Sequence, residues 1–204
     1  VLEGKKIYGM EEFKLLPPIA RNHIVEWVGH ALEDKEGLNS QEYFFVEVTL
    51  NGNDLGVYAI EFFNKGLLEN RKAHEGIIFS AKLNRIRIFN EKKISKDINN
   101  RNRIRLLQSA LQSVNNNEME IDRIFDLEKF AAHFAIIDLM NGYHAVGFNS
   151  FYYFNPITNL IEPITREYNS LRYSDGQINN KIMIDDKRRT SGTFLNKLFQ
   201  NKNF

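Results

Sequence analysis

The sequence of 204 residues contains no cysteine, four prolines and a single tryptophan. Without cysteine the chain can form no disulfide bond, no thiolate metal site and no cysteine nucleophile, and the cellular compartment stays open. No run of about 18 uninterrupted apolar residues is present, so no membrane-spanning helix is expected. The 27 Lys and Arg residues nearly cancel the 26 Asp and Glu residues, for a formal net charge of +1. A protein that binds polyanions through its overall charge is therefore excluded.

The common catalytic signatures are missing as well. The sequence has no Walker-type phosphate loop, no Gly-x-Gly-x-x-Gly, no His-Glu-x-x-His and no Gly-x-Ser-x-Gly. The five histidines, none with metal-ligand spacing, are His23, His30, His74, His133 and His144. From the spacing alone, each is expected to be a surface or hydrogen-bonded structural residue, and no zinc site is expected.

Apolar material is plentiful: hydrophobic residues make up 43% of the chain and aromatic residues 12%. This composition predicts a packed core and excludes disorder of the whole chain. Because the sequence starts at Val1 rather than at a methionine, we expect a fragment of a longer protein. We expect one domain over residues 1–204, with a hairpin-and-strand part over about 1–95 and a helical part with a second hairpin over about 96–204.

Two β-hairpins stand out in the pattern. Apolar and polar residues alternate over 44–50 and 55–62 on either side of Asn51-Gly52, the strongest short hairpin signal. Residues 76–81 predict a further strand. The aromatic run 151–154 and the apolar run 160–164 flank a five-residue turn and predict the second hairpin.

Helical spacing predicts four helices. One begins near Pro18 and carries Ile24, Trp27, Val28 and Ala31; a second carries Ile104, Leu107, Leu111 and Val114. A third is capped by Asp126 and runs to about Met140, with apolar residues on all sides, so it is expected to be buried all round. The last carries Phe194, Leu195, Leu198 and Phe199. This mixed order of hairpins and helices predicts an α+β fold with antiparallel sheet rather than a doubly wound parallel one.

Oxygen-bearing side chains flank the second hairpin. Asn149 precedes its first strand, while Glu167 and Asn169 follow its second. Antiparallel pairing places the outer ends of the two strands side by side, so these side chains should lie within reach of one another. Carboxylate and amide oxygens together suit a hard cation such as Mg²⁺. The alternative is that these residues only cap strands and bond the backbone.

Three blocks of the sequence resemble the CotH family of spore-coat-type atypical protein kinases. They read FVEVTLNGNDLGVYAIEFF (45–63), EGIIFSAK (75–82) and AIIDLMNGYHAVGFNSFYYFNPITNLIEPITREYN (135–169). The first block matches the family's Asn-Gly turn followed by Leu-Gly-Val-Tyr and a glutamate, with the residues Asn51, Gly52, Leu55, Gly56, Val57, Tyr58 and Glu61. The third ends where the family has Pro-x-x-Trp-Asp-x-Asp, here Pro163 to Asn169. The resemblance runs from about Lys5 to Leu171.

This resemblance implies a divergent member with a protein-kinase-like fold that uses ATP and Mg²⁺ to phosphorylate Ser or Thr hydroxyls of a protein substrate. In it, Glu167 and Asn169 take the positions of the two metal-binding aspartates, and Asn149 takes that of a further metal or phosphate contact. Glu61 takes the position of a residue that orients a phosphate-binding lysine.

The sequence departs from the family at several of these positions. One carboxylate remains where the family has two, which should weaken binding of Mg²⁺. The family's lysine falls on Ser80, so Lys82, which is on the same face of a strand, is the candidate phosphate contact, with Lys72 and Lys65 as alternatives. Arg166 replaces the tryptophan and adds a cation beside the phosphates. His144 stands where the family often has an acidic base for the acceptor hydroxyl.

Two other functions remain open on these residues. The changes at both aspartate positions are equally consistent with a non-catalytic pseudokinase, a binding module of the same fold. Residues 82–105 hold nine basic and two acidic residues, a candidate surface for nucleic acid or an acidic partner. Because the basic residues at 101, 103 and 105 spread around a helix instead of forming one stripe, nucleic-acid binding is the less favoured function.

Overall fold

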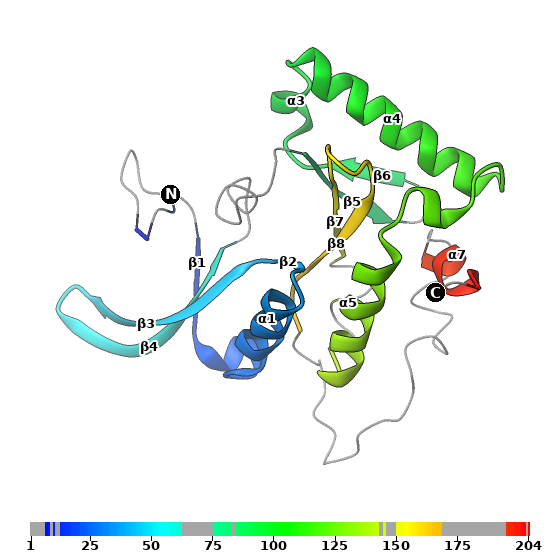
Figure 1. Cartoon of the computed structure of the whole chain (residues 1–204). Coiled ribbons are helices and arrows are strands. Elements are labelled where there is room, and N and C mark those ends of the chain that lie inside the picture. The colour runs from blue at the N-terminus through cyan, green and yellow to red at the C-terminus, as the bar shows by residue number, and fades with distance from the viewer. Residues whose placement is uncertain are drawn as a thin grey trace.

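The computed structural model describes residues 7–8, 10, 13–62, 76–82, 85–142, 145, 150–168, 195–202 and 204. Its first sheet is antiparallel, with the strand order β1 (Lys14–Leu16), β4 (Asn53–Phe62) and β3 (Glu42–Leu50). The first predicted hairpin, β3–β4, is confirmed, and it extends away from the second sheet in Figure 1. At its turn both Asn51 (φ 52°) and Gly52 (φ 81°) have the left-handed backbone that a two-residue hairpin turn requires.

The second sheet has five strands, in the order β2-β8-β7-β5-β6. Their bounds are β2 Asn39–Ser40, β5 Ile77–Lys82, β6 Arg85–Ile88, β7 Phe151–Phe154 and β8 Ile161–Thr165. The second predicted hairpin is therefore confirmed as β7–β8, and the strand predicted at 76–81 as β5. The strand β2 joins β8 in parallel, which brings a segment near residue 40 beside the end of β8.

Two of the predicted helices have clear capping signals. Helix α4 (Ile98–Asn115) starts at Asp97, whose side chain accepts a hydrogen bond from the Asn100 amide at 3.0 Å. Helix α5 (Leu127–Leu139) starts at Asp126, which accepts from the Lys129 amide at 3.1 Å. The prediction that α5 is buried all round is wrong: Leu139 is 75% exposed, because the helix packs on the sheet and α1 with only part of its circumference.

The other helices in the described part of the chain are short, apart from α1. They are η1 (Pro18–Arg21), α1 (Val25–Lys35), α3 (Glu91–Ile94), η2 (Ile121–Arg123) and α7 (Leu195–Gln200). The predicted helices near Pro18 and at the C-terminal end thus correspond to η1 with α1 and to α7. A helical turn that residues 64–72 also suggest lies outside the described residues.

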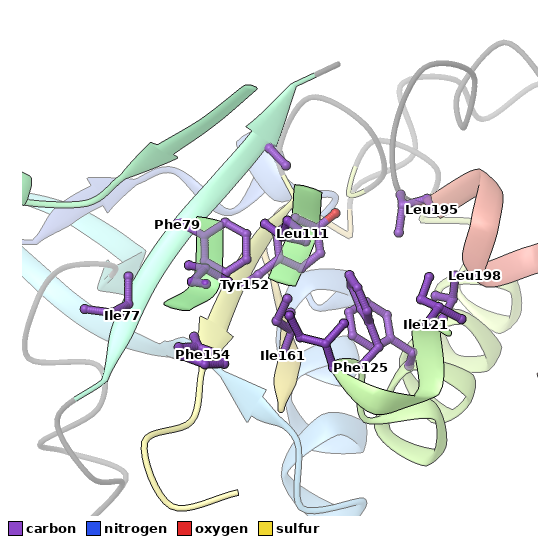
Figure 2. Packing of buried hydrophobic residues seen from close by; sticks show 14 of the residues in the cluster. Ile77, Phe79, Leu111, Ile121, Phe125, Tyr152, Phe154, Ile161, Leu195 and Leu198 are labelled. Carbon is purple, nitrogen blue, oxygen red and sulfur yellow. The ribbon is translucent and has the colours of Figure 1, made fainter. Parts of the chain in front are cut away.

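The main core covers one face of the second sheet. Figure 2 shows Ile77, Phe79, Tyr152, Phe154 and Ile161 of that sheet facing Leu111 of α4, with Ile121, Phe125, Leu195 and Leu198 beside them. Alternation along the strands places a smaller group, Ile78, Tyr153 and Ile164, on the opposite face with Phe89 and Phe151 packed against it. The second face therefore carries fewer apolar residues and more polar ones, which is where the candidate site begins.

The combination of helices with largely antiparallel sheets makes this an α+β protein, as predicted. No helix in the described part of the chain is long and apolar enough to cross a membrane.

Candidate functional site

A cluster of ion pairs forms around Glu61, near the end of β4. Its carboxylate is fully buried and accepts from Lys14 Nζ at 2.8 Å and from Nε and Nη2 of Arg21 at 2.9 and 2.8 Å. Lys14 reaches it from the neighbouring strand β1, where Lys14 and Glu61 are paired in register. Arg21 reaches it from the end of η1, so side chains from two other elements meet at the carboxylate of β4.

The same arginine connects Glu61 to Glu167, which lies two residues beyond β8. Arg21 Nη2 donates to Oε1 of Glu167 at 3.0 Å. Arg166 completes the cluster, with its Nη2 3.8 Å from Oε1 of Glu61 and 4.0 Å from Oε1 of Glu167. The guanidinium of Arg166 also lies 5.1 Å from the centre of the Phe151 ring. The cluster therefore holds three cations and two carboxylates, an excess of one positive charge.

The electrostatics favour the charged form of these groups. Burial by itself would raise the pKa of Glu61, but the hydrogen bond from Lys14 and the charge of Arg21 hold this pKa below its ordinary value. Burial likewise would lower the pKa of Arg21, but Glu61 and Glu167 raise it above its ordinary value. Glu61 and Arg21 are thus both ionised at neutral pH.

A cavity of about 410 Å³ adjoins the cluster at Arg166. Its lining comes from β5, β6, β7 and the residues that follow β6 and β8: Ser80, Arg87, Ile88, Phe89, Asn90, Phe151 and Arg166. Two guanidinium groups, two phenyl rings and two small polar side chains therefore share one concave surface. Anionic ligands that also carry a flat apolar part match that chemistry.

Three of the predicted site residues come together: Glu61, Glu167 and Arg166. Lys82 is the last residue of β5, two residues after Ser80 of the cavity, and its side chain lies outside the described part. Asn149, Asn169 and His144 also lie outside the described residues, so their placement beside Glu167 stays a prediction. In the described part, the cations around Glu61 are Lys14 and Arg21, which donate hydrogen bonds to it, and Arg166 at 3.8 Å.

Lys14 and Arg21 were not identified from the sequence. Arg21 lies 40 residues from Glu61 and 146 residues from Glu167, and no local motif links these positions. For Lys14 a weak signal existed, because a charged residue on a strand beside a hairpin glutamate can pair with it across the ladder. The strand β6 also carried an unused signal, the alternation of arginine and isoleucine from Arg85 to Ile88.

The carboxylates of the cluster decide whether a magnesium ion fits this site. No group of three His, Cys, Asp or Glu side chains that could hold a metal occurs among the described residues. Glu61 is fully buried and engaged by Lys14 and Arg21, which leaves Glu167 as the one carboxylate of the cluster suited to a metal. Mg²⁺ is commonly held by one or two carboxylates together with substrate phosphates. The donor set therefore fits an ion that binds together with a nucleotide, and Glu167 would hold it.

Comparison with protein-family models identifies a match. No curated protein matches the sequence significantly. The family model described as CotH kinase protein matches residues 5–204, nearly the whole chain. The protein therefore belongs to the CotH kinase protein family.

Proposed function

We propose that the protein is a phosphotransferase that binds Mg²⁺-ATP beside Glu167 and transfers the γ-phosphoryl group to a Ser or Thr hydroxyl of another protein. The observation that carries the proposal is the convergence of Arg21 and Arg166 on Glu167 at the edge of the arginine-lined cavity. Membership of the kinase family supplies the class of reaction.

The charges of the cluster suit polyphosphate. Phosphoryl transfer requires little covalent chemistry from the protein, so most of the catalysis comes from positioning and from cations that offset the developing charge. The cluster has one excess positive charge with Arg166 included, and Arg87 adds a second guanidinium group to the cavity that Arg166 also lines. Phe89 and Phe151 supply the apolar surface on which a nucleobase can stack.

Each residue then has a role in the proposed reaction. Arg21 and Arg166 bind phosphate oxygens, and Lys82 is the candidate for a further phosphate contact. Glu167, with Asn149 and Asn169, would hold Mg²⁺, which when bound offsets negative charge on the phosphates. The acceptor oxygen forms a bond to the γ-phosphorus while the bond to the β–γ bridging oxygen breaks and ADP leaves. The hydroxyl proton passes to a general base, for which His144 is the candidate.

A second candidate function, a pseudokinase that binds partners without transfer, is favoured by one contact. Arg21 donates to the same Glu167 oxygen that a metal would use, and Arg166 lies 4.0 Å from it. Arginine at a metal ligand competes directly with the cation. If Arg21 stays on Glu167 when nucleotide binds, the metal is not held and transfer is lost.

Thermal unfolding with and without Mg²⁺-ATP tests the binding step. A ligand at 100 times its dissociation constant that binds only the folded protein stabilises it by about 2.7 kcal/mol, which shifts the unfolding midpoint measurably. We expect this shift in the parent protein, a loss of it in Glu167→Ala, and an unchanged shift in Glu47→Ala, which removes an exposed glutamate from β3. ATP with EDTA separates nucleotide binding from metal binding.

A transfer assay with γ-labelled ATP and dephosphorylated casein distinguishes the two functions. Label on casein that disappears in Glu167→Ala supports the kinase. Saturable binding of Mg²⁺-ATP without label on casein or on the protein itself favours the pseudokinase. A folded parent protein that shows neither a midpoint shift nor transfer would contradict both forms of the nucleotide-binding proposal.

A further inference from the structure

Helix α1 buries three ionisable side chains and leaves its tryptophan exposed. Glu26, His30 and Glu33 are 0%, 3% and 0% exposed, while Trp27 of the same helix is 47% exposed. The three buried residues are spaced by four and three positions, so they share one face of the helix. Burying three ionisable groups is costly unless each is paired, so this face needs partners elsewhere in the fold.

The partners lie in the segment that carries Glu167. Oε1 of Glu26 accepts the backbone N–H of Glu167 at 2.8 Å. Two turns along the helix, Oε1 of Glu33 accepts a hydrogen bond from the hydroxyl of Thr165. One face of α1 therefore binds both sides of residue 166.

Tyr168 provides a third attachment of the segment to α1. Its ring packs so closely on Gly29 that a Cβ atom added there would lie 2.3 Å from a ring carbon. The ring also meets His30 edge-on, with 5.5 Å between the ring centres. Glycine at position 29 thus allows the close approach of the helix to the segment.

His30 and His133 bind the buried carboxylates. Nε2 of His30 lies 3.2 Å from Oε1 of Glu26, and its Nδ1 lies 3.4 Å from Oε2 of Glu33. On the far side, His133 of α5 lies with Nδ1 2.6 Å from the Thr165 hydroxyl. Since that hydroxyl donates to Glu33, its oxygen is left to accept a hydrogen bond from Nδ1 of His133.

The backbone of Glu167 has an unfavourable conformation that contacts from the surrounding structure must stabilise. Its φ of 63° lies in the left-handed region, which costs a residue with a side chain of this size free energy relative to an ordinary conformation. This turn directs the Glu167 side chain to Arg21, in the ion-pair cluster described above. A left-handed residue just after a strand persists only where the surrounding structure holds it.

We infer that Glu26 is a positioning residue of the site: it holds the left-handed backbone of Glu167 through the amide, and so aims the Glu167 carboxylate at the phosphate and metal position. The role of the Glu167 carboxylate rests on the proposed function, whereas the hydrogen bond from the Glu167 amide to Glu26 does not depend on it. Helix α1 then acts as a rigid support that connects α5, the end of β8 and the ion-pair cluster.

Three variants test this role. Glu26→Leu keeps the volume but removes the acceptor, Glu26→Gln keeps an acceptor oxygen without the charge, and Trp27→Gln changes the exposed face of the same helix. Two nuclear magnetic resonance readouts need no nucleotide: the exchange rate of the Glu167 amide and the ¹³C shift of its carboxylate. We expect exchange to be roughly tenfold faster in Glu26→Leu, rescued in Glu26→Gln and unchanged in Trp27→Gln.

The midpoint shift by Mg²⁺-ATP separates the two proposals. A parent protein without a shift, in which Glu26→Leu still changes the Glu167 amide and carboxylate signals, overturns the proposed function and leaves the positioning role standing. Unchanged Glu167 signals in Glu26→Leu overturn the positioning role, as does a full Mg²⁺-ATP shift in a variant whose Glu167 amide has become unprotected. A Glu167 amide that exchanges freely in the parent protein overturns it without any variant.

Discussion

Helices α1 and α4 bury opposite kinds of side chain. The buried face of α4 consists of Ile104, Leu107, Leu111 and Val114, whereas α1 buries Glu26, His30 and Glu33 and leaves Trp27 half-exposed. Apolar burial stabilises a helix with whatever apolar surface it meets. Buried charge stabilises only where a partner of the right chemistry lies at the right place. Helix α4 therefore mainly stabilises the fold, whereas the charged face of α1 mainly fixes the position of the groups that it binds.

The largest loss of stability is expected when one carboxylate is removed from the charged face of α1. Glu33→Ala removes the carboxylate that pairs with His30, His133 and Thr165, and leaves these groups buried without it. Breaking a buried pair on one side costs about 3–5 kcal/mol. Urea unfolding followed by circular dichroism should show this loss, with Glu36→Ala, an exposed glutamate just beyond the helix, as the control. A loss below about 1 kcal/mol would contradict the pairing.

A similar but somewhat smaller loss of stability is expected when a leucine is truncated on the apolar face of α4. Leu107 is fully buried in the main core, and Leu→Ala in such a site costs about 2–5 kcal/mol. The neighbouring Leu106 is 50% exposed, so Leu106→Ala should cost much less. The variants of the two helices should differ in the exchange rate of the Glu167 amide. Leu107→Ala should leave this rate unchanged in the folded protein, whereas Glu33→Ala should raise it.

The sequence predicted α4 because all the information for it is local. The prediction used apolar residues three and four positions apart and a terminating run of asparagines, all within the helix or at its end. The cap at Asp97, which the structure adds, is equally local. The two hairpins were predicted for the same reason, since Asn51-Gly52 and the turn at 155–159 specify them within a few residues.

The same reasoning found the helix α1 but not its buried face. The apolar spacing of Ile24, Trp27, Val28 and Ala31 indicated a helix, yet Ile24 and Trp27 are 61% and 47% exposed. The partners of the charged face lie far along the chain: His133 is 100 residues from Glu33, and Glu167 is 141 residues from Glu26. A pattern within one helix cannot show that such distant groups will neutralise its charges.

The charged face should also make stability depend on pH. Burial alone would lower the pKa of His30, but hydrogen bonds and charges from Glu26 and Glu33 raise it to about 9 from an ordinary 6.5. Because the folded-state pKa of His30 is raised, its interactions with the two glutamates contribute fully to the stability of the fold below pH 6.5. That contribution is lost as the pH rises through about 9. Burial raises the pKa of the facing Tyr43 to about 12 and also raises that of Tyr168, so neither phenol titrates in this window.

We therefore expect the free energy of unfolding to fall by roughly 1–3 kcal/mol between pH 6.5 and pH 9.5. The variant His30→Gln, which cannot carry the charge, should show a flatter profile over the same range. Unfolding in urea at a series of pH values measures both. A parent profile that is as flat as that of His30→Gln would show that His30 is not charged in the folded protein.

The smallest change in stability is expected when the whole charged face is made apolar, as in the triple variant Glu26→Met, His30→Leu, Glu33→Met. Because the desolvation cost of all three groups disappears together with their pairing, replacement of a buried charged set by apolar residues is often neutral or stabilising. We expect the triple variant to lie within about 2 kcal/mol of the parent, less destabilised than Glu33→Ala alone, since coupled groups are not additive. Its Glu167 amide, without an acceptor, should nevertheless exchange faster and its Mg²⁺-ATP shift should be lost. A stable triple variant with a protected Glu167 amide would show that α1 supports the segment by packing of Tyr168 on Gly29 alone, and that its charges serve neither stability nor geometry.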